Sequence, residues 1–351
     1  MRLIGKSNIK PLLKALHGKY EVMVPQEYDS GVGFKPYLPE KYEPDFSYYG
    51  NTKISPKDLF LPQSEVMFTF QEEDEDIWLN TLESKILGKN RIIFGMRSCD
   101  VNALLIMDKV FKENLKDSYY YKRRRNTIIV AMACTSPDKD CFCTSFGTGP
   151  TLMGGADVLL TDISERYLGS KYLVETFTER GKELIEEYAE FFDPAKPSDL
   201  KRKNKLIEEA EKYMRRAPVK EIQRKLSLMF NHPYWETLSK RCFGCASCIF
   251  ICPTCHCFDM ADEYNPLTSE GHMVRCLDSC AFASFTRLAG EDNPRVTKTE
   301  RLKQRFYHKY KYFKEDHGIF GCVGCGRCIN VCPSNIDPRE IIQNIANVGE
   351  K

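Results

Sequence analysis

Two copies of one cysteine pattern constrain this chain more than any other feature. Each copy reads Cys-x2-Cys-x2-Cys-x3-Cys-Pro, and the copies span residues 242–253 and 322–333. Cysteines at i, i+3 and i+6 can wrap one iron-sulfur cubane from a single loop, and in proteins with two such runs the fourth cysteine binds the cluster of the other run. The following proline fixes φ and turns the chain away. The pattern therefore predicts two 4Fe-4S clusters.

The crossed arrangement predicts which cysteines share a cluster. The first cluster is expected on Cys242, Cys245, Cys248 and Cys332. The second is expected on Cys322, Cys325, Cys328 and Cys252. The alternative, structural zinc on Cys-x2-Cys pairs, needs two pairs for each metal ion and leaves the fourth cysteine and its proline without a role. We therefore favour clusters over zinc.

Composition favours a cytoplasmic protein of two or three domains. The 351 residues can bury a sizeable core. With 51 Lys and Arg against 49 Asp and Glu, the net charge of +2 gives no electrostatic case for nucleic acid or an anionic membrane. The ferredoxin-like spacing and the lack of an apolar stretch behind the N-terminus argue against secretion. No run reaches the roughly 18 to 20 apolar residues of a spanning helix, so direct membrane insertion is not expected.

Residues 1–175 are predicted to form a mixed α/β domain. Short apolar runs bounded by charged or turn-prone segments, as expected for buried strands, recur at 66–70, 91–95, 127–133 and 157–162. Between the second and third runs, apolar residues at helical spacing predict a helix that starts at the N-cap Ser98. These segments together predict a strand, helix, strand unit.

The rest of the chain is predicted to be helical, so that the fold class is α+β and multidomain. Residues 176–235 are charged and periodic, which predicts a linker of two or three helices. Residues 236–345 predict a helical ferredoxin-like dicluster domain, because the insertion between the two cysteine runs is too long for a compact two-hairpin ferredoxin. Helices are expected around 280–287 and 300–314 within this insertion.

Two charged runs are interpreted as solvated surface. They are the acidic run at 72–76 and the basic run at 122–125. The alternative for the basic run is a docking patch for a partner or for a flavin phosphate.

Four cysteines of the N-terminal domain predict a third 4Fe-4S cluster. They lie at or after the ends of expected strands, and they are Cys99, Cys134, Cys141 and Cys143. Ligands bind at the carboxyl ends of strands in open α/β sheets. The helix that begins near Cys99 would also stabilise thiolates through its N-terminal dipole. The alternative is that Cys99 packs in the core, while Cys141 and Cys143 are free or redox-active.

The last four cysteines lie in the insertion: Cys255, Cys257, Cys276 and Cys280. They are expected to tune a neighbouring cluster through hydrogen bonds, with a fourth metal site as the alternative. Cys248, Cys252 and Cys255 also have the spacing of radical enzymes that use S-adenosylmethionine. We set this aside, because Thr254 replaces the usual aromatic residue and two of these cysteines already have a predicted role.

Five motifs, taken in order, resemble one family. They are GMRSCDVNALLIMDKVF, CTSPDKDCFCTSFGTGP, CPTCHCFDM, LDSCAFASFTRLAGEDNPR and CVGCGRCINVCP. Over roughly residues 55–340, the chain resembles the family of 4Fe-4S dicluster electron-transfer subunits found in anaerobic sulfite reductase and, as the beta subunit, in cytoplasmic nickel-iron sulfhydrogenases.

The resemblance implies a cytoplasmic electron-transfer subunit without catalytic residues of its own. Such subunits relay electrons between a flavoprotein that binds FAD and NAD(P) and a catalytic subunit of sulfite reductase or hydrogenase type. The chain has no Gly-x-Gly-x-x-Gly fingerprint and no Walker loop, so nucleotides are expected on a partner. The alternatives are a redox-sensing regulatory iron-sulfur protein and a scaffold that clusters hold together.

Overall fold

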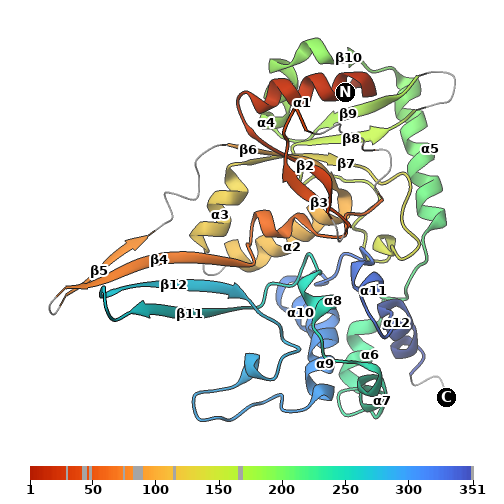
Figure 1. Cartoon of the computed structure of the whole chain (residues 1–351). Helices are drawn as coiled ribbons and strands as arrows, with labels where there is room; N and C mark the ends of the chain where they lie inside the picture. Colours follow the sequence, from red (N-terminus) through yellow and green to blue (C-terminus); the bar gives the residue numbers. More distant parts are fainter. Residues whose placement is uncertain are drawn as a thin grey trace.

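The computed structural model of the chain (Figure 1) describes residues 1–28, 31–41, 46, 50–73, 76–81, 90–113, 116–164 and 169–348. Its largest sheet has eight strands in the order β10-β1-β9-β8-β7-β6-β2-β3. The four strands β8, β7, β6 and β2 are parallel, and the outer pairs are antiparallel. The strands are β1 (Arg2–Gly5), β2 (Glu21–Tyr28), β3 (Gly31–Pro36), β6 (Arg91–Arg97), β7 (Thr127–Met132), β8 (Val158–Asp162), β9 (Lys171–Thr176) and β10 (Asp193–Pro194).

Helices cover both faces of this sheet. One face carries α1 (Ile9–His17) and α4 (Glu179–Glu187), and the other carries α2 (Ser98–Lys112), α3 (Ser118–Arg125) and α5 (Pro197–Tyr213). Successive side chains of a strand point to opposite faces, so Ile92 packs with α1 and α4, whereas Ile93 packs with α2. A strand buried on both faces reads as a continuous apolar run. The predicted strands at 91–95, 127–133 and 157–162, and the strand, helix, strand unit β6-α2-β7, are confirmed.

The predicted start of α2 was off by one residue. Arg97 is the N-cap, and Ser98 is the first helical residue. The Ser98 hydroxyl donates to the carbonyl of Pro150 at 2.7 Å, so it ties the helix start to the loop after β7.

A second, four-stranded antiparallel sheet projects from the body as an arm (Figure 1). Its order is β11-β12-β4-β5, with the bounds β4 (Ser64–Glu73), β5 (Asp76–Thr81), β11 (Phe258–Asn265) and β12 (Glu270–Leu277). The predicted strand at 66–70 is confirmed as part of β4, but its expected burial and its place among the strands of the α/β domain were wrong. This segment is half-buried and pairs with β12, a partner from the insertion that no local pattern could indicate.

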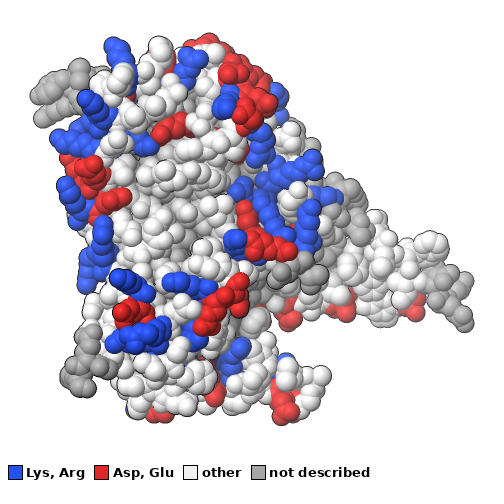
Figure 2. All heavy atoms as spheres, turned by 180° about the vertical axis from the view of Figure 1, so that it is seen from behind, with Lys and Arg blue, Asp and Glu red and all other residues white. Residues whose placement is uncertain are grey.

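The described part of the arm is mostly uncharged in Figure 2, with a few acidic side chains along one edge. Strands β4, β5 and β11 contain no Lys or Arg, and the one arginine of β12, Arg275, is buried in an ion pair with Glu65. The pairings of β10 with β1 and of β12 with β4 cross the expected boundaries, and the division into three domains stays a prediction.

The basic run at the end of α3 differs from its interpretation as solvated surface. Arg123 pairs with Glu65 at 2.6 Å and Arg124 with Asp108 at 3.3 Å, and both arginine side chains are largely buried. Of the acidic run at 72–76, Asp74 and Glu75 lie outside the described residues.

The C-terminal region is helical and contains both cysteine runs. Its helices are α6 (Ile222–Leu228), α7 (Tyr234–Arg241), α8 (Ser247–Phe250), α9 (Lys298–Tyr307), α10 (Phe313–His317), α11 (Arg327–Asn330) and α12 (Pro338–Ala346). A π-helical segment, His308–Tyr312, joins α9 to α10. Their core forms around Trp235 and Phe306.

The predicted helix at 300–314 is confirmed, and the one at 280–287 was wrong. The described residues there make only one 3-10 turn, Ser284–Thr286. None of its residues is buried, and a short helix without a packed face is marginal in water. Within the described ranges, no helix is long and apolar enough to cross a membrane.

Candidate metal centre

The two cysteine runs fold in the same way. Each loop places two residues in the left-handed region, Gly244 (φ 71°) and Ala246 (φ 62°) in the first run and Gly324 (φ 64°) and Gly326 (φ 75°) in the second. A short helix follows in both cases, α8 in the first run and α11 in the second. The sequence repeat is therefore also a structural repeat.

Backbone amides in both loops point at sulfur. The N–H of Gly244 donates to the Cys242 sulfur, and that of Gly324 donates to the Cys322 sulfur, each at 3.4 Å. Such N–H donors stabilise thiolates and tune the potential of a cluster.

The first predicted set of thiols lines one cavity. Its lining includes Cys242, Cys245, Cys248 and Cys332, together with Cys328 of the second set. Cys332 belongs to the other run, so the fold brings it to the place that crossed ligation requires. Cys245 is exposed, and a hydrogen bond with the Ser247 hydroxyl lowers the pKa of its thiol.

The second predicted set is buried more deeply. Cys252 and Cys325 are buried, and burial raises the pKa of Cys325 to about 11. A negative charge on the Cys252 sulfur also raises the pKa of three thiols of the second run, those of Cys322, Cys325 and Cys328. The fourth cysteine of the first run therefore lies with the second run.

These thiols fit iron-sulfur clusters. Each set offers four sulfur ligands, the soft donors that such clusters and zinc use. The buried thiols with raised pKa hold their protons at neutral pH, so metal cations must supply the positive charge that stabilises the thiolates. A bound cluster would supply one-electron storage, and the cysteine loops would hold and orient it.

The four N-terminal cysteines converge next to the second run. Cys141 donates its S–H to the carbonyl of Cys325 at 3.8 Å, and Cys99 and Cys143 are close enough to Cys325 that ionisation of the Cys325 thiol would raise the pKa of both. Ionisation of Cys134, just after the end of β7, would likewise raise the pKa of Cys141 and Cys143. Burial raises the pKa of Cys143 to about 12. The fold thus gathers these thiols on one side of Cys325.

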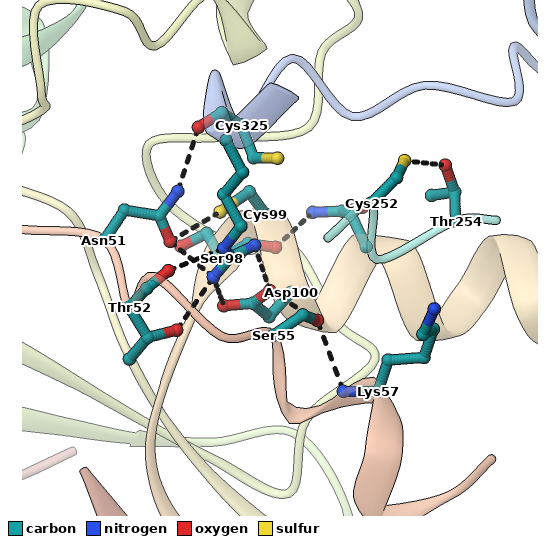
Figure 3. Close-up of polar contacts among 12 residues, drawn as sticks. Asn51, Thr52, Ser55, Lys57, Ser98, Cys99, Asp100, Cys252, Thr254 and Cys325 are labelled. Atoms are coloured by element: carbon teal, nitrogen blue, oxygen red, sulfur yellow. Dashed lines mark hydrogen bonds and ion pairs between the residues drawn. The ribbon is translucent and has the colours of Figure 1, made fainter. Parts of the chain in front are cut away.

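A buried ion pair joins the second run to this N-terminal group. Arg327, which is 3% exposed, donates to both carboxylate oxygens of Asp100, which is 1% exposed, at 2.7 and 2.8 Å. Arg327 also donates to the Thr52 carbonyl at 2.6 Å and to the Asn51 side chain. The Asn51 amide donates to the carbonyl of Cys325 at 2.9 Å (Figure 3).

Sequence reasoning missed this junction, although one signal was present. Arg327 is the only charged residue between the four cysteines of either run, and Asp100 directly follows Cys99.

Two glycines of the second run lie against the N-terminal loop. A Cβ at Gly324 would lie 2.6 Å from the Phe142 carbonyl oxygen, and one at Gly326 would lie 2.5 Å from that of Asp140. The N–H of Phe142 donates to the Gly324 carbonyl at 2.8 Å. Only residues without a side chain allow this approach.

The cysteines of the insertion form two groups. Cys257 and Cys280 lie together at the base of the arm, where a hydrogen bond from Cys280 lowers the pKa of Cys257 to about 7. Cys255 contacts Cys252 instead. Cys276 lies 3.5 Å from the Ser64 hydroxyl, on the arm itself.

Comparison with known proteins agrees with this geometry. Residues 241–336 match the family described as a 4Fe-4S dicluster domain, so the class of the C-terminal region is that of dicluster iron-sulfur proteins. The chain is also 32% identical over 299 residues to sulfhydrogenase 2 subunit beta from Pyrococcus furiosus, and the alignment covers 85% of this chain and 84% of that protein. The chain belongs to the sulfhydrogenase beta subunit family, as the five motifs predicted.

Proposed function

We propose that the protein is an iron-sulfur electron-transfer subunit. It relays electrons between a nicotinamide-dependent flavoprotein and a terminal redox partner of the nickel-iron hydrogenase or sulfite reductase type. The observation that carries the proposal is that the three predicted sets of thiols lie next to one another. The proposed path runs from the exposed Cys245 through the buried second run to the four N-terminal cysteines beside Cys325.

A path with two separate ends favours a relay over a storage site. One end, at the cavity of the first run, opens to solvent at Cys245, and the other end lies in the first turn of α2 and in the loop after β7. The relative from Pyrococcus furiosus is itself named as one subunit of a sulfhydrogenase. We therefore propose that a different partner docks at each end of the path. For a chain that resembles cytoplasmic subunits, we place this complex in the cytoplasm.

The N-terminal cluster gives the proposal its sharpest test. Protein prepared without oxygen should carry about twelve iron atoms for three cubanes, and the Cys141→Ala/Cys143→Ala double variant should carry about eight. The double variant should lose electron flow from reduced nicotinamide to the terminal acceptor in the assembled complex. Its two remaining clusters should still be reduced by dithionite.

Cys276→Ala is the control, because this cysteine lies on the arm and outside the three predicted sets. It should keep about twelve iron atoms and full electron flow. If the double variant also keeps full electron flow, the N-terminal thiols are not on the electron path.

A further inference from the structure

Two buried cations lie beside predicted cluster ligands without a carboxylate partner among the described residues. Arg305 in α9 is 7% exposed, and Lys309 in the π-helical segment is 6% exposed. Among the described residues, neither side chain lies within ion-pair distance of an Asp or Glu. The buried Arg327 and Arg339, by contrast, have such partners, Asp100 and Asp140. A buried charge without compensation is strongly destabilising. Buried Lys225 also has no carboxylate within ion-pair distance among the described residues, but it lies outside the cysteine runs, whereas Arg305 and Lys309 lie beside predicted cluster ligands that can supply negative charge.

The Lys309 ammonium is held in place by neutral groups beside Cys252. It donates to the Thr254 hydroxyl at 2.8 Å and to the Gly321 carbonyl at 3.0 Å. The Thr254 oxygen lies 3.3 Å from the Cys252 sulfur, and the two side chains point toward each other in Figure 3. The Thr254 hydroxyl donates to the Gly321 carbonyl at 2.8 Å, so it holds the ammonium near the Cys252 sulfur without donating to that sulfur.

The backbone fixes this position. The N–H of Gly321, the residue before the second cysteine run, donates to the Lys309 carbonyl at 2.8 Å. A Cβ at Gly321 would lie 3.3 Å from the Lys309 Cα, so the two chains are closely packed. Single π-helical turns inside α-helices are rare and occur frequently at functional sites.

The Lys309 ammonium lies beside the second predicted set. Its hydrogen-bond partners are Thr254, two residues after Cys252, and Gly321, the residue before Cys322. Both of these cysteines belong to the second set. Arg305 differs, because its neighbours include Cys248 of the first set and Cys328 of the second.

We propose that Lys309 sets the reduction potential of the second cluster, on Cys322, Cys325, Cys328 and Cys252, selectively over that of the first. The inference rests on the proposed function, since it needs clusters on these thiols. A cluster held by the second set would gain one negative charge when its donor reduces it, and the nearby Lys309 ammonium would stabilise that reduced form. Lys309 thereby offsets the effect of deep burial, which disfavours the more highly charged reduced cluster.

The test is a potentiometric titration of the full-length protein, with each cluster followed by its paramagnetic signal. In Lys309→Met, the reduction equilibrium of the second cluster should fall about tenfold, a shift of about 59 mV to lower potential. The first cluster, identified because Cys245→Ser perturbs its signal, should keep its potential. Unchanged potentials in a variant that holds both reducible clusters would overturn the inference.

Lys225→Met is the matched control. Lys225 is also a buried lysine that donates to a backbone carbonyl, that of Val348 at 2.5 Å, and it lies in α6, outside the two cysteine runs. Both cluster potentials should stay at the wild-type values in this variant, so a shift equal to that of Lys309→Met would assign the effect to general packing and overturn the inference.

If Lys309→Met assembles poorly, Thr254→Val provides a second test of the inference. It removes the hydroxyl between the ammonium and Cys252, and the second cluster should shift in the same direction by a smaller factor. An unchanged or higher potential would count against the inference. A wild-type protein without reducible clusters would instead reject the proposed function.

Discussion

The two cysteine runs are near copies in sequence and backbone, yet their surroundings differ. The first run borders a cavity, with Cys245 and Phe243 exposed. The second run is covered by the N-terminal body, through the Arg327 ion pair and the close approach of Gly324 to the loop after β7. A ligand pattern therefore specifies the cluster, while residues far away in sequence specify its burial and its neighbours. Matched positions of the two runs can test this difference.

The largest difference in unfolding free energy is expected between Arg327→Ala and Ser247→Ala. These two residues occupy matched positions, since each precedes the third cysteine of its run. Arg327→Ala leaves Asp100 buried without a partner, and we expect it to cost about 3 to 5 kcal/mol of unfolding free energy. Ser247→Ala removes only a hydroxyl beside an exposed thiol, and we expect a cost of about 1 kcal/mol or less. Anaerobic denaturant unfolding of the cluster-loaded proteins measures both.

The double variant Arg327→Met/Asp100→Leu checks the physical reason for the large effect. Replacing both members of a buried ion pair by apolar residues is often tolerated. It should therefore recover part of the lost stability. Equal losses in the variants at Arg327 and Ser247 would contradict the proposed contrast between the runs.

A smaller difference is expected between Gly324→Ala and Gly244→Ala. Both glycines have positive φ, so both variants carry a strain of roughly 1 to 2 kcal/mol. A Cβ at Gly324 would also meet the N-terminal loop, whereas at Gly244 its nearest neighbour is the Lys298 side chain at 3.8 Å. Gly324→Ala should cost about 1 to 3 kcal/mol more than Gly244→Ala in the same unfolding experiment. Equal losses of unfolding free energy in the two variants would mean that the N-terminal loop shifts to accept the added Cβ without a free-energy cost.

The smallest effect concerns access to the clusters. An iron chelator should remove iron from the first cluster severalfold faster than from the second, since Cys245 is exposed whereas Cys252 and Cys325 are buried. The loss of each paramagnetic signal with time measures the two rates. Faster loss from the second cluster would reverse the comparison.

The parts of the fold that the sequence predicted correctly depend on local patterns. Strands β6, β7 and β8 are continuous apolar runs, and the cysteine loops depend on spacings of two and three residues. The parts that were missed are contacts between distant segments. The pairing of β4 with β12 and the ion pair of Asp100 with Arg327 each join residues about 200 positions apart. The local sequence pattern of one segment does not identify the other segment as its partner.

Contacts between distant segments also limited how much of the candidate site could be predicted. Spacing suggested the two ferredoxin-type sets of cysteines, and positions at the ends of expected strands suggested the N-terminal four, but only the fold places those four beside Cys325. Lys309 carried no signal of its own, because its importance depends on the π-helical turn that buries it.

The arm also has a consequence for how the chain is made. Strands β4 and β5 leave the ribosome long before β12, which pairs with β4 from Ser64 to Gln71. At a synthesis rate of about 5 to 20 residues per second, β4 waits roughly 10 to 40 s with an open edge. An open, partly apolar edge is a hazard for aggregation, and it closes only after the first cysteine run has been synthesised. Completion of the arm is thus coupled in time to the appearance of the first cluster loop, so that a nascent chain that stalls before residue 270 keeps this edge exposed.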